Sequence, residues 1–290
     1  MSDEGIRCGI LGGSGLYSLA GMSDVDEVEV ETPFGPPSDK LLVGSLEGRR
    51  VAFLARHGRG HRLLPTEINF RANIFAMKSL GIERIVSASA VGSLRESIRP
   101  RDAVLVDQFI DRTNRRVSTF FGSGIVAHVS LADPVCPQLR EILRDAREEG
   151  EPTLHDGGTY VCIEGPAFST RAESELFRSW DADVIGMTNL QEARLAREAE
   201  ICYASLALVT DFDCWHEEED DVSVGAVMKN LTANGLFAAK ILRRAVRSIP
   251  ERRQGCSCED ALRGAIITRP EEIDDATRRK LAPIVGRHLD

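Results

Sequence analysis

A glycine-rich turn near the amino terminus carries groups that suit an anion. Residues 12–16 read GGSGL and directly follow the apolar run 6–11, which is typical of a buried strand. Glycines let backbone N–H groups approach an anion closely, and Ser14 adds a hydroxyl donor. The turn lacks the Gly-Lys-Ser/Thr ending of a nucleotide-hydrolysing loop. It therefore indicates either a cradle for phosphate or a phosphate ester, or a tight strand-ending turn that binds nothing.

A second cluster of this kind follows another predicted strand. The buried run 51–55 is followed by RHGRGH at residues 56–61. The guanidinium of Arg56 is a planar fork that matches phosphate oxygens, and His57 beside it adds a donor. A solvated basic loop is the ordinary alternative. Two such turns at strand ends, in a chain that is acidic overall, favour a phosphate site.

Other chemically useful residues also come just after predicted strands, where open α/β sheets place their ligands. They are residues 89–92, Phe168 with Ser169, Met187 with Thr188, and Asp211 with Asp213. In a water-poor pocket the pKa of an aspartate rises, so that the carboxyl group can donate a proton. Asp211 is the candidate for this role, and a turn-capping aspartate is the alternative.

Composition narrows the class of protein. The chain has 290 residues, 42% of them hydrophobic and 28% charged, and a formal net charge of −9. Such a chain can bury a full core, and its acidity disfavours nucleic acid or an anionic membrane as the main partner. No apolar run approaches the roughly 18 residues that span a bilayer, and the start MSDE does not resemble a signal peptide. We expect a cytoplasmic enzyme.

The seven cysteines fit that compartment, because an odd and scattered set suits reduced thiols better than a disulfide framework. Only Cys256 and Cys258 form a pattern. They could form a strained local disulfide, whereas a zinc site needs about four ligands and the sequence shows no second pair. We therefore predict reduced, structural cysteines and no metal.

Strands and helices alternate along the chain. The runs 41–44 and 51–55 predict a hairpin, and helices are predicted over residues 66–81, 137–146, 190–199 and 223–246. Thr170 with Glu173 predicts a capping box, and Thr188 with Asn189 predicts the cap of the third helix. The pattern predicts one α/β domain, a mixed β-sheet flanked by helices, over residues 1–250, with residues 251–290 as a helical extension of the same domain.

Six motifs, in order, resemble the purine nucleoside phosphorylase family, and within it the 5'-methylthioadenosine phosphorylase branch. The resemblance spans about residues 6–249. The motifs are GGSGL at 12–16, TPFG at 32–35, RHG at 56–58, EGP at 164–166, Met187 with Thr188, and TDFDCW at 210–215.

The resemblance implies a nucleoside phosphorylase-like fold, a homotrimer, and phosphorolysis of S-methyl-5'-thioadenosine to adenine and 5-methylthioribose 1-phosphate. Phosphate would be a co-substrate, and no metal or organic cofactor would be needed. By position, Ser14, Arg56, His57, Ser89, Ala90 and Thr188 would bind phosphate, and Met187 would face the ribose. Phe168 and Ser169 would lie at the base, and Asp211 and Asp213 would contact the purine edge. The 5' pocket would be lined by Val224, Val227 and Met228, and His128 of a neighbouring subunit would complete it.

Physical chemistry supports this implication independently. Glycosidic cleavage builds positive charge on the ribose and negative charge on the purine, so a site needs phosphate on one side and a proton donor on the other. The residues at 224, 227 and 228 share one helix face, and a stripe packed in the core is the commoner meaning of that spacing. One departure from the family pattern is Gly186, where some members carry asparagine.

The sequence leaves three alternative functions open. The enzyme could prefer 6-oxopurine nucleosides such as inosine or methylthioinosine. The glycine turn could serve a dinucleotide oxidoreductase, although Ser18 stands at the third glycine position. The chain could also bind purines without catalysis.

Overall fold

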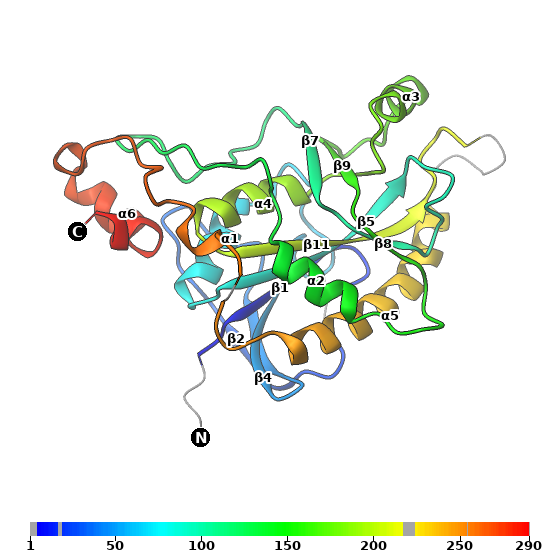
Figure 1. Cartoon of the computed structure of the whole chain (residues 1–290), viewed down its shortest axis with the longest axis horizontal. Helices are drawn as coiled ribbons and strands as arrows, with labels where there is room; N and C mark the ends of the chain where they lie inside the picture. The colour runs from blue at the N-terminus through cyan, green and yellow to red at the C-terminus, as the bar shows by residue number, and fades with distance from the viewer. Residues whose placement is uncertain (1–4, 17–18, 217–223, 254, 290) are drawn as a thin grey trace.

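One mixed sheet lies between two layers of helices (Figure 1). The structure, a computed structural model, describes residues 5–16, 19–216, 224–253 and 255–289. In the helix that begins at residue 224, side chains are described from residue 230 on. Its strands are β1 (Cys8–Gly12), β2 (Ser23–Val28), β3 (Leu41–Leu46), β4 (Arg49–Ala55), β5 (Arg84–Ser93), β6 (Ala103–Leu105), β7 (Gln108–Arg112), β8 (Leu154–Asp156), β9 (Thr159–Ile163), β10 (Val184–Gly186) and β11 (Cys202–Asp211).

The helices alternate with these strands, as the sequence predicts. They are α1 (Phe70–Ser79), α2 (Pro137–Asp145), α3 (Arg171–Ser179), α4 (Asn189–Glu198), α5 (Val224–Ser248) and α6 (Asp275–Val285), with short 3₁₀ helices η1 (Cys258–Asp260), η2 (Pro270–Glu272) and η3 (Gly286–His288). The prediction of a single mixed α/β sheet flanked by helices is confirmed.

The sheet brings several strand ends to one edge. Its main order is β2-β3-β4-β1-β5-β10-β9-β7, and β11, β6 and β8 branch from β5. Strand β1 is parallel to β4 and β5, and β11 is parallel to β5. Because the carboxyl ends of parallel strands point the same way, the turns that follow β1, β4 and β11 meet at one edge. The predicted β3–β4 hairpin is present.

Alternating side chains of the strands bind the two helical layers. Ile10 and Phe53 belong to a core with α2 and α5, whereas their neighbours Leu11 and Leu54 belong to a core with α1, α4 and α6. This period of two is what a sheet buried on both faces requires. The segment after α5 contributes to both cores, through Cys258 on one side and Leu281 on the other.

Two helix starts differ from the sequence prediction. Helix α1 begins at Phe70 and not near Thr66, because the side chain of Asn69 caps it by accepting the Ala72 N–H at 3.1 Å. Helix α4 begins at Asn189, but Thr188 makes no side-chain capping bond. The predicted Thr170–Glu173 capping box of α3 is confirmed.

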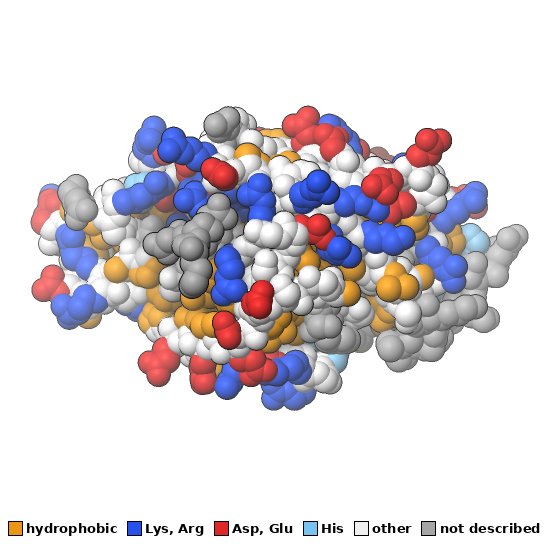
Figure 2. All heavy atoms as spheres, turned by 90° about the horizontal axis from the view of Figure 1, so that it is seen from below, with side chains coloured by type: hydrophobic (Ala, Val, Ile, Leu, Met, Phe, Trp, Pro, Cys, Tyr) orange, Lys and Arg blue, Asp and Glu red, His pale blue; other side chains and the backbone are white. Residues whose placement is uncertain are grey.

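The surface carries mixed charge. On the face seen from below, Lys and Arg side chains alternate with Asp and Glu, and hydrophobic atoms show between them (Figure 2). In the part of the chain that the structure describes, every helix is too short or too polar to cross a membrane.

We expect Glu198, at the end of α4, to make the fold less stable as the pH rises. Its carboxylate accepts hydrogen bonds from the Thr119 hydroxyl and the Phe120 N–H, each at 2.7 Å, yet burial raises its pKa from 4.5 to about 7. The folded state therefore holds a proton that the unfolded state has released between these two values. The stabilisation is complete below pH 4.5 and is lost as the pH rises through 7.

A Glu198→Gln variant should lose this dependence. Between pH 5 and 8 the wild-type unfolding free energy should fall by about 2–3 kcal/mol more than that of the variant, as urea titrations would measure. Glu175→Gln is the matched control, because Glu175 is an exposed helix residue. Equal pH profiles for wild type and Glu198→Gln would contradict the assignment.

Candidate active site

A cavity of about 540 Å³ opens where the strand ends meet. Strand β11 bulges after Val209 so that Asp211 lies opposite Gly92 of β5. A Cβ atom at Gly92 would stand 2.9 Å from an Asp211 carboxylate oxygen, so the close approach requires glycine. Of the residues that the sequence singled out, the lining includes Ser14, Arg56, His57, Ser89, Ala90, Phe168, Ser169, Met187, Thr188, Asp211 and Asp213.

The glycine turn positions Ser14. The Gly13 N–H donates to the Ala88 carbonyl at 2.9 Å, so this N–H is committed to the fold and is not offered to an anion. A Cβ atom at Gly13 would lie 2.7 Å from Nη1 of Arg56 and 2.8 Å from the Ala88 oxygen. These glycines therefore allow the turn to pack against β5 and Arg56, and Ser14 reaches the cavity.

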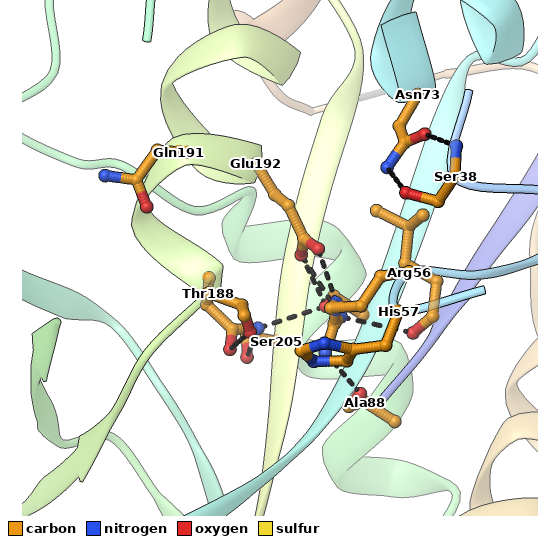
Figure 3. Close-up of polar contacts among 12 residues, drawn as sticks. Ser38, Arg56, His57, Asn73, Ala88, Thr188, Gln191, Glu192 and Ser205 are labelled. Carbon is orange, nitrogen blue, oxygen red and sulfur yellow. Dashed lines mark hydrogen bonds and ion pairs between the residues drawn. The ribbon is translucent and has the colours of Figure 1, made fainter. Parts of the chain in front are cut away.

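Arg56 is buried and almost fully hydrogen-bonded (Figure 3). Its Nε donates to Glu192 at 2.7 Å, Nη1 donates to the Ala88 carbonyl at 3.0 Å, and Nη2 donates to the second Glu192 oxygen at 3.3 Å. Nη2 also contacts the Ser87 hydroxyl. One hydrogen on Nη1 has no partner among the described residues, so Arg56 offers the cavity a single donor and not a two-pronged fork.

Glu192 is a functional residue that the sequence analysis missed. It lies on α4, is 2% exposed, and also accepts from the hydroxyls of Ser87 at 2.7 Å and Tyr203 at 2.9 Å. Asn189 completes the network, because its Nδ2 lies within 3.0 Å of the hydroxyls of Ser87, Tyr203 and Ser205 and shares its two hydrogens among them. In sequence the helix reads NLQEARLARE, which looks like a solvated charged face, so only the fold identifies this ion pair.

His57 is a neutral acceptor. Burial lowers its pKa to about 4, and Nδ1 lies 2.8 Å from the Leu63 carbonyl. Because a carbonyl can only accept, Nδ1 carries the proton and Nε2 is the acceptor. The ring stacks on His61 with centroids 4.2 Å apart. The sequence suggested that His57 donates to phosphate, but its Nδ1–H donates to the Leu63 carbonyl within the loop.

Ser89 provides an uncommitted hydroxyl. It lies on β5 beside Ala90, is 3% exposed, and its Oγ has no hydrogen-bond partner in the described part of the chain. Buried hydroxyls are nearly always paired, so an orphan that lines a cavity is suited to a ligand. Thr188, also buried, lines the same cavity at the start of α4.

Two carboxyl groups, those of Asp211 and Asp213, also line the cavity. Burial raises the pKa of Asp211, although the Thr210 hydroxyl donates to it at 2.6 Å and the Asp213 N–H at 2.9 Å. Burial also raises the pKa of Asp213, and the nearby Asp211 charge adds to this rise. Both groups are therefore disposed to hold a proton in the cavity.

Arg116 is a second residue that the sequence analysis missed. It donates to the Glu164 carbonyl at 2.5 Å, to the Glu164 carboxylate at 3.3 Å and to the Met187 carbonyl. It thereby connects the loop after β9 to the start of α4. Met187, whose carbonyl takes part in this connection, lines the cavity, and so does Phe168, which lies in the same loop after β9 and is 50% exposed.

Gly186, which departs from the family pattern, has a packing reason. A side chain at this position would run into the hydroxyl of the fully buried Tyr160. Tyr160 in turn receives the Thr188 N–H at 3.4 Å. The glycine thus lets Tyr160 support the turn that carries Met187 and Thr188.

Four predicted residues lie outside this cavity or outside the description. His128 lines a separate cavity of about 770 Å³ in this chain, and the resemblance assigns it to a neighbouring subunit. The side chains of Val224, Val227 and Met228 are outside the described residues, although α5 begins at Val224.

The arrangement joins anion-suited donors to buried proton-holding carboxyl groups, as in enzymes that transfer a glycosyl group to phosphate. The phosphorylase superfamily matches residues 7–247, and the chain belongs to it. It is 58% identical over 281 residues to the S-methyl-5'-thioadenosine phosphorylase of Koribacter versatilis, covering 97% of this chain and 96% of that protein. To the same-named protein of Geobacter sulfurreducens it is 57% identical, covering 97% and 98%.

Solved structures show the same likeness. A methylthioadenosine phosphorylase from an Antarctic soil metagenomic library matches with a TM-score of 0.92 and 49% identity, covering 97% of this chain and 99% of that one. A mutant adenosine/methylthioadenosine phosphorylase from Schistosoma mansoni, in complex with methylthioadenosine, matches with a TM-score of 0.83 and 35% identity, covering 93% and 99%.

Proposed function

We propose that the chain catalyses phosphorolysis of S-methyl-5'-thioadenosine to adenine and 5-methylthioribose 1-phosphate. One observation carries the proposal: a single cavity is lined by the unpaired hydroxyl of Ser89 and by two buried carboxyl groups with raised pKa, those of Asp211 and Asp213. Relatives at 57–58% identity bear the name of this activity.

The reaction requires the phosphate-binding donors and the carboxyl groups to act together. A phosphate oxygen bonds to C1' of the ribose while the C1'–N9 bond breaks, and the electron pair of that bond moves onto the purine. A protonated Asp211 gives its proton to N7 and so neutralises the leaving base. The phosphate charge stabilises the positive charge that develops on the ribose.

On the phosphate side, the hydroxyls of Ser14, Ser89 and Thr188 and the remaining Nη1 hydrogen of Arg56 would donate. Ala90 would leave room for the anion, and Nε2 of neutral His57 would accept the P–OH hydrogen of a hydrogen phosphate ion. Glu192 already neutralises Arg56, so the site binds phosphate through directed hydrogen bonds more than through net charge.

On the nucleoside side, Asp211, Asp213 and Ser169 would read the purine edge, Phe168 would stack at the base, and Met187 would face the ribose. The 5' methylthio group would lie against Val224, Val227 and Met228. No cofactor other than the co-substrate phosphate is part of this proposal.

The active form would be a homotrimer in the cytoplasm, with His128 reaching the 5' pocket of a neighbour. Exposed hydrophobic residues beside His128 support an interface there: Val126 is 46% exposed and Ile267 is 64% exposed, and the Ile267 N–H donates to the Val126 carbonyl at 2.9 Å. Sedimentation of the purified chain would test the trimer.

The proposal is tested by following base release from methylthioadenosine, adenosine and inosine, with and without phosphate. We expect adenine from methylthioadenosine only when phosphate is present, and the highest kcat/KM for that nucleoside. Equal turnover without phosphate would indicate a hydrolase. A preference for inosine would indicate the 6-oxopurine alternative, and binding without turnover would indicate a purine-binding protein.

Ser89→Ala should weaken the use of phosphate without destabilising the fold. Its hydroxyl has no partner to lose among the described residues, whereas a hydrogen bond to a charged ligand contributes about 1.5–3 kcal/mol. We expect the KM for phosphate to rise about 10- to 100-fold, as initial rates at varied phosphate would measure.

Ser93→Ala on the same strand is the matched control. Its hydroxyl donates to the Arg95 carbonyl at 2.8 Å and is not part of the cavity lining. Its loss should therefore lower stability and leave the KM for phosphate unchanged. An unchanged phosphate KM in Ser89→Ala would remove Ser89 from the site.

A further inference from the structure

Four of the seven cysteines gather in one cluster away from the active-site cavity. The sulfurs of Cys136, Cys202, Cys256 and Cys258 all lie within 4.8 Å of one another, and those of Cys202 and Cys256 are 3.6 Å apart. A tetrahedral zinc ion with Zn–S bonds of about 2.3 Å holds its sulfurs about 3.8 Å apart. The cluster therefore has the size and the ligand number of a structural zinc site.

Three different parts of the fold hold these sulfurs in place. Cys136 precedes α2, and its N–H donates to the Tyr203 carbonyl at 2.8 Å. Cys202 begins β11, and its N–H donates to the Glu83 carbonyl at 2.9 Å. Cys256 and Cys258 belong to the segment after α5. Two ligands thus come from the rigid core and two from the chain that folds over it.

The position of Cys136 favours a thiolate. Cys136 stands at the amino terminus of α2, where the helix dipole stabilises negative charge. Cys136, Cys202 and Cys258 are each at most 3% exposed, which protects a metal–thiolate centre from water.

An entry path is present. Cys256 and Cys258 line the cavity of about 770 Å³, which shares no lining residue with the active-site cavity. Metal can reach the sulfurs from this side, and the thiol protons can leave to solvent as the ion binds.

We propose that Cys136, Cys202, Cys256 and Cys258 bind one zinc ion that fastens the carboxyl-terminal segment to the start of β11 and the start of α2. The ion has four protein ligands and no open position, so its role is structural. It is separate from the phosphorolysis proposed above, and the catalytic residues need no contribution from it.

The test uses the full-length chain, purified under reducing conditions and exposed to zinc or cobalt. We expect one equivalent of tightly held zinc per chain by elemental analysis. Cobalt in its place should give the intense thiolate-to-metal charge-transfer absorption and tetrahedral d–d bands of a four-sulfur site. Removal of the metal with a chelator should lower the Tm, and returning zinc should restore it.

Variants assign the ligands. Cys256→Ser with Cys258→Ser should abolish both the metal equivalent and the cobalt spectrum. Cys8→Ala should retain both, because Cys8 is a buried cysteine on β1 outside the cluster. If the double variant fails to fold, the cobalt spectrum and the chelator-dependent Tm of the unmodified chain still decide the matter.

Thiol titration of the denatured protein distinguishes a zinc site from disulfide bonds within the cluster, which are the main alternative. A metal site leaves all seven thiols titratable once the chelator has removed the ion, whereas two disulfides within the cluster leave only three. Three titratable thiols, or metal content below stoichiometry with no cobalt charge-transfer band, would overturn the proposal.

Discussion

Arg56→Ala should both destabilise the protein and cripple its use of phosphate. The substitution leaves Glu192 as a buried, unpaired carboxylate, and losing one partner of such a pair costs about 3–5 kcal/mol of stability. The lost Nη1 donor should raise the KM for phosphate roughly 10- to 100-fold. Urea titration measures the first effect, and initial rates at varied phosphate measure the second.

A double variant separates the two effects. Arg56→Met with Glu192→Leu removes both charges, so much of the lost stability should return, because apolar residues of similar volume can replace a buried ion pair. The use of phosphate should stay impaired, since the donor is still missing. If phosphate KM recovers together with stability, Arg56 acts only through the fold and does not contact phosphate.

Asp211→Asn should shift the preference from 6-aminopurines toward 6-oxopurines. A protonated carboxyl group has one donor for N7 and one acceptor for an N6 amine, whereas the asparagine NH₂ group donates to both N7 and O6. The ratio of kcat/KM for methylthioadenosine to that for inosine should fall by about 30-fold, on the order of 2 kcal/mol.

The matched control is Asp102→Asn. The Asp102 carboxylate accepts the Arg99 N–H at 2.9 Å and lies 3.0 Å from Nε2 of His155, and none of these residues is among the described residues that line the cavity. The substrate ratio in this variant should equal that of the wild type. An unchanged ratio in Asp211→Asn, measured beside this control, would show that Asp211 does not read the purine.

Much of the fold is visible in the sequence because it depends on local patterns. Strands β1, β4 and β5 each contain an apolar run, and the Thr170–Glu173 capping box involves residues only three positions apart. The predicted start of α1 near Thr66 is wrong, because the side chain that caps this helix is that of Asn69, three residues further on. Helix boundaries depend on such single hydrogen bonds, which spacing alone does not rank.

The cavity shows the same division. Residues that follow strands could be predicted to converge, because parallel strands end at one edge. The partners of those residues could not. Glu192 lies 136 residues from Arg56, and its burial follows only from how α4 packs on β5 and β11. Likewise, the sequence shows one cysteine pair, and the fold adds Cys136 and Cys202 to it.

Phosphate labelled with ¹⁸O in all four oxygens would show whether phosphate itself attacks the nucleoside. The enzyme would be incubated with methylthioadenosine and this phosphate in ordinary water, and the sugar product analysed by mass spectrometry. We expect 5-methylthioribose 1-phosphate that retains all four labelled oxygens, in equal amount to adenine. Free methylthioribose with an oxygen from water, released at the same rate without phosphate, would contradict it.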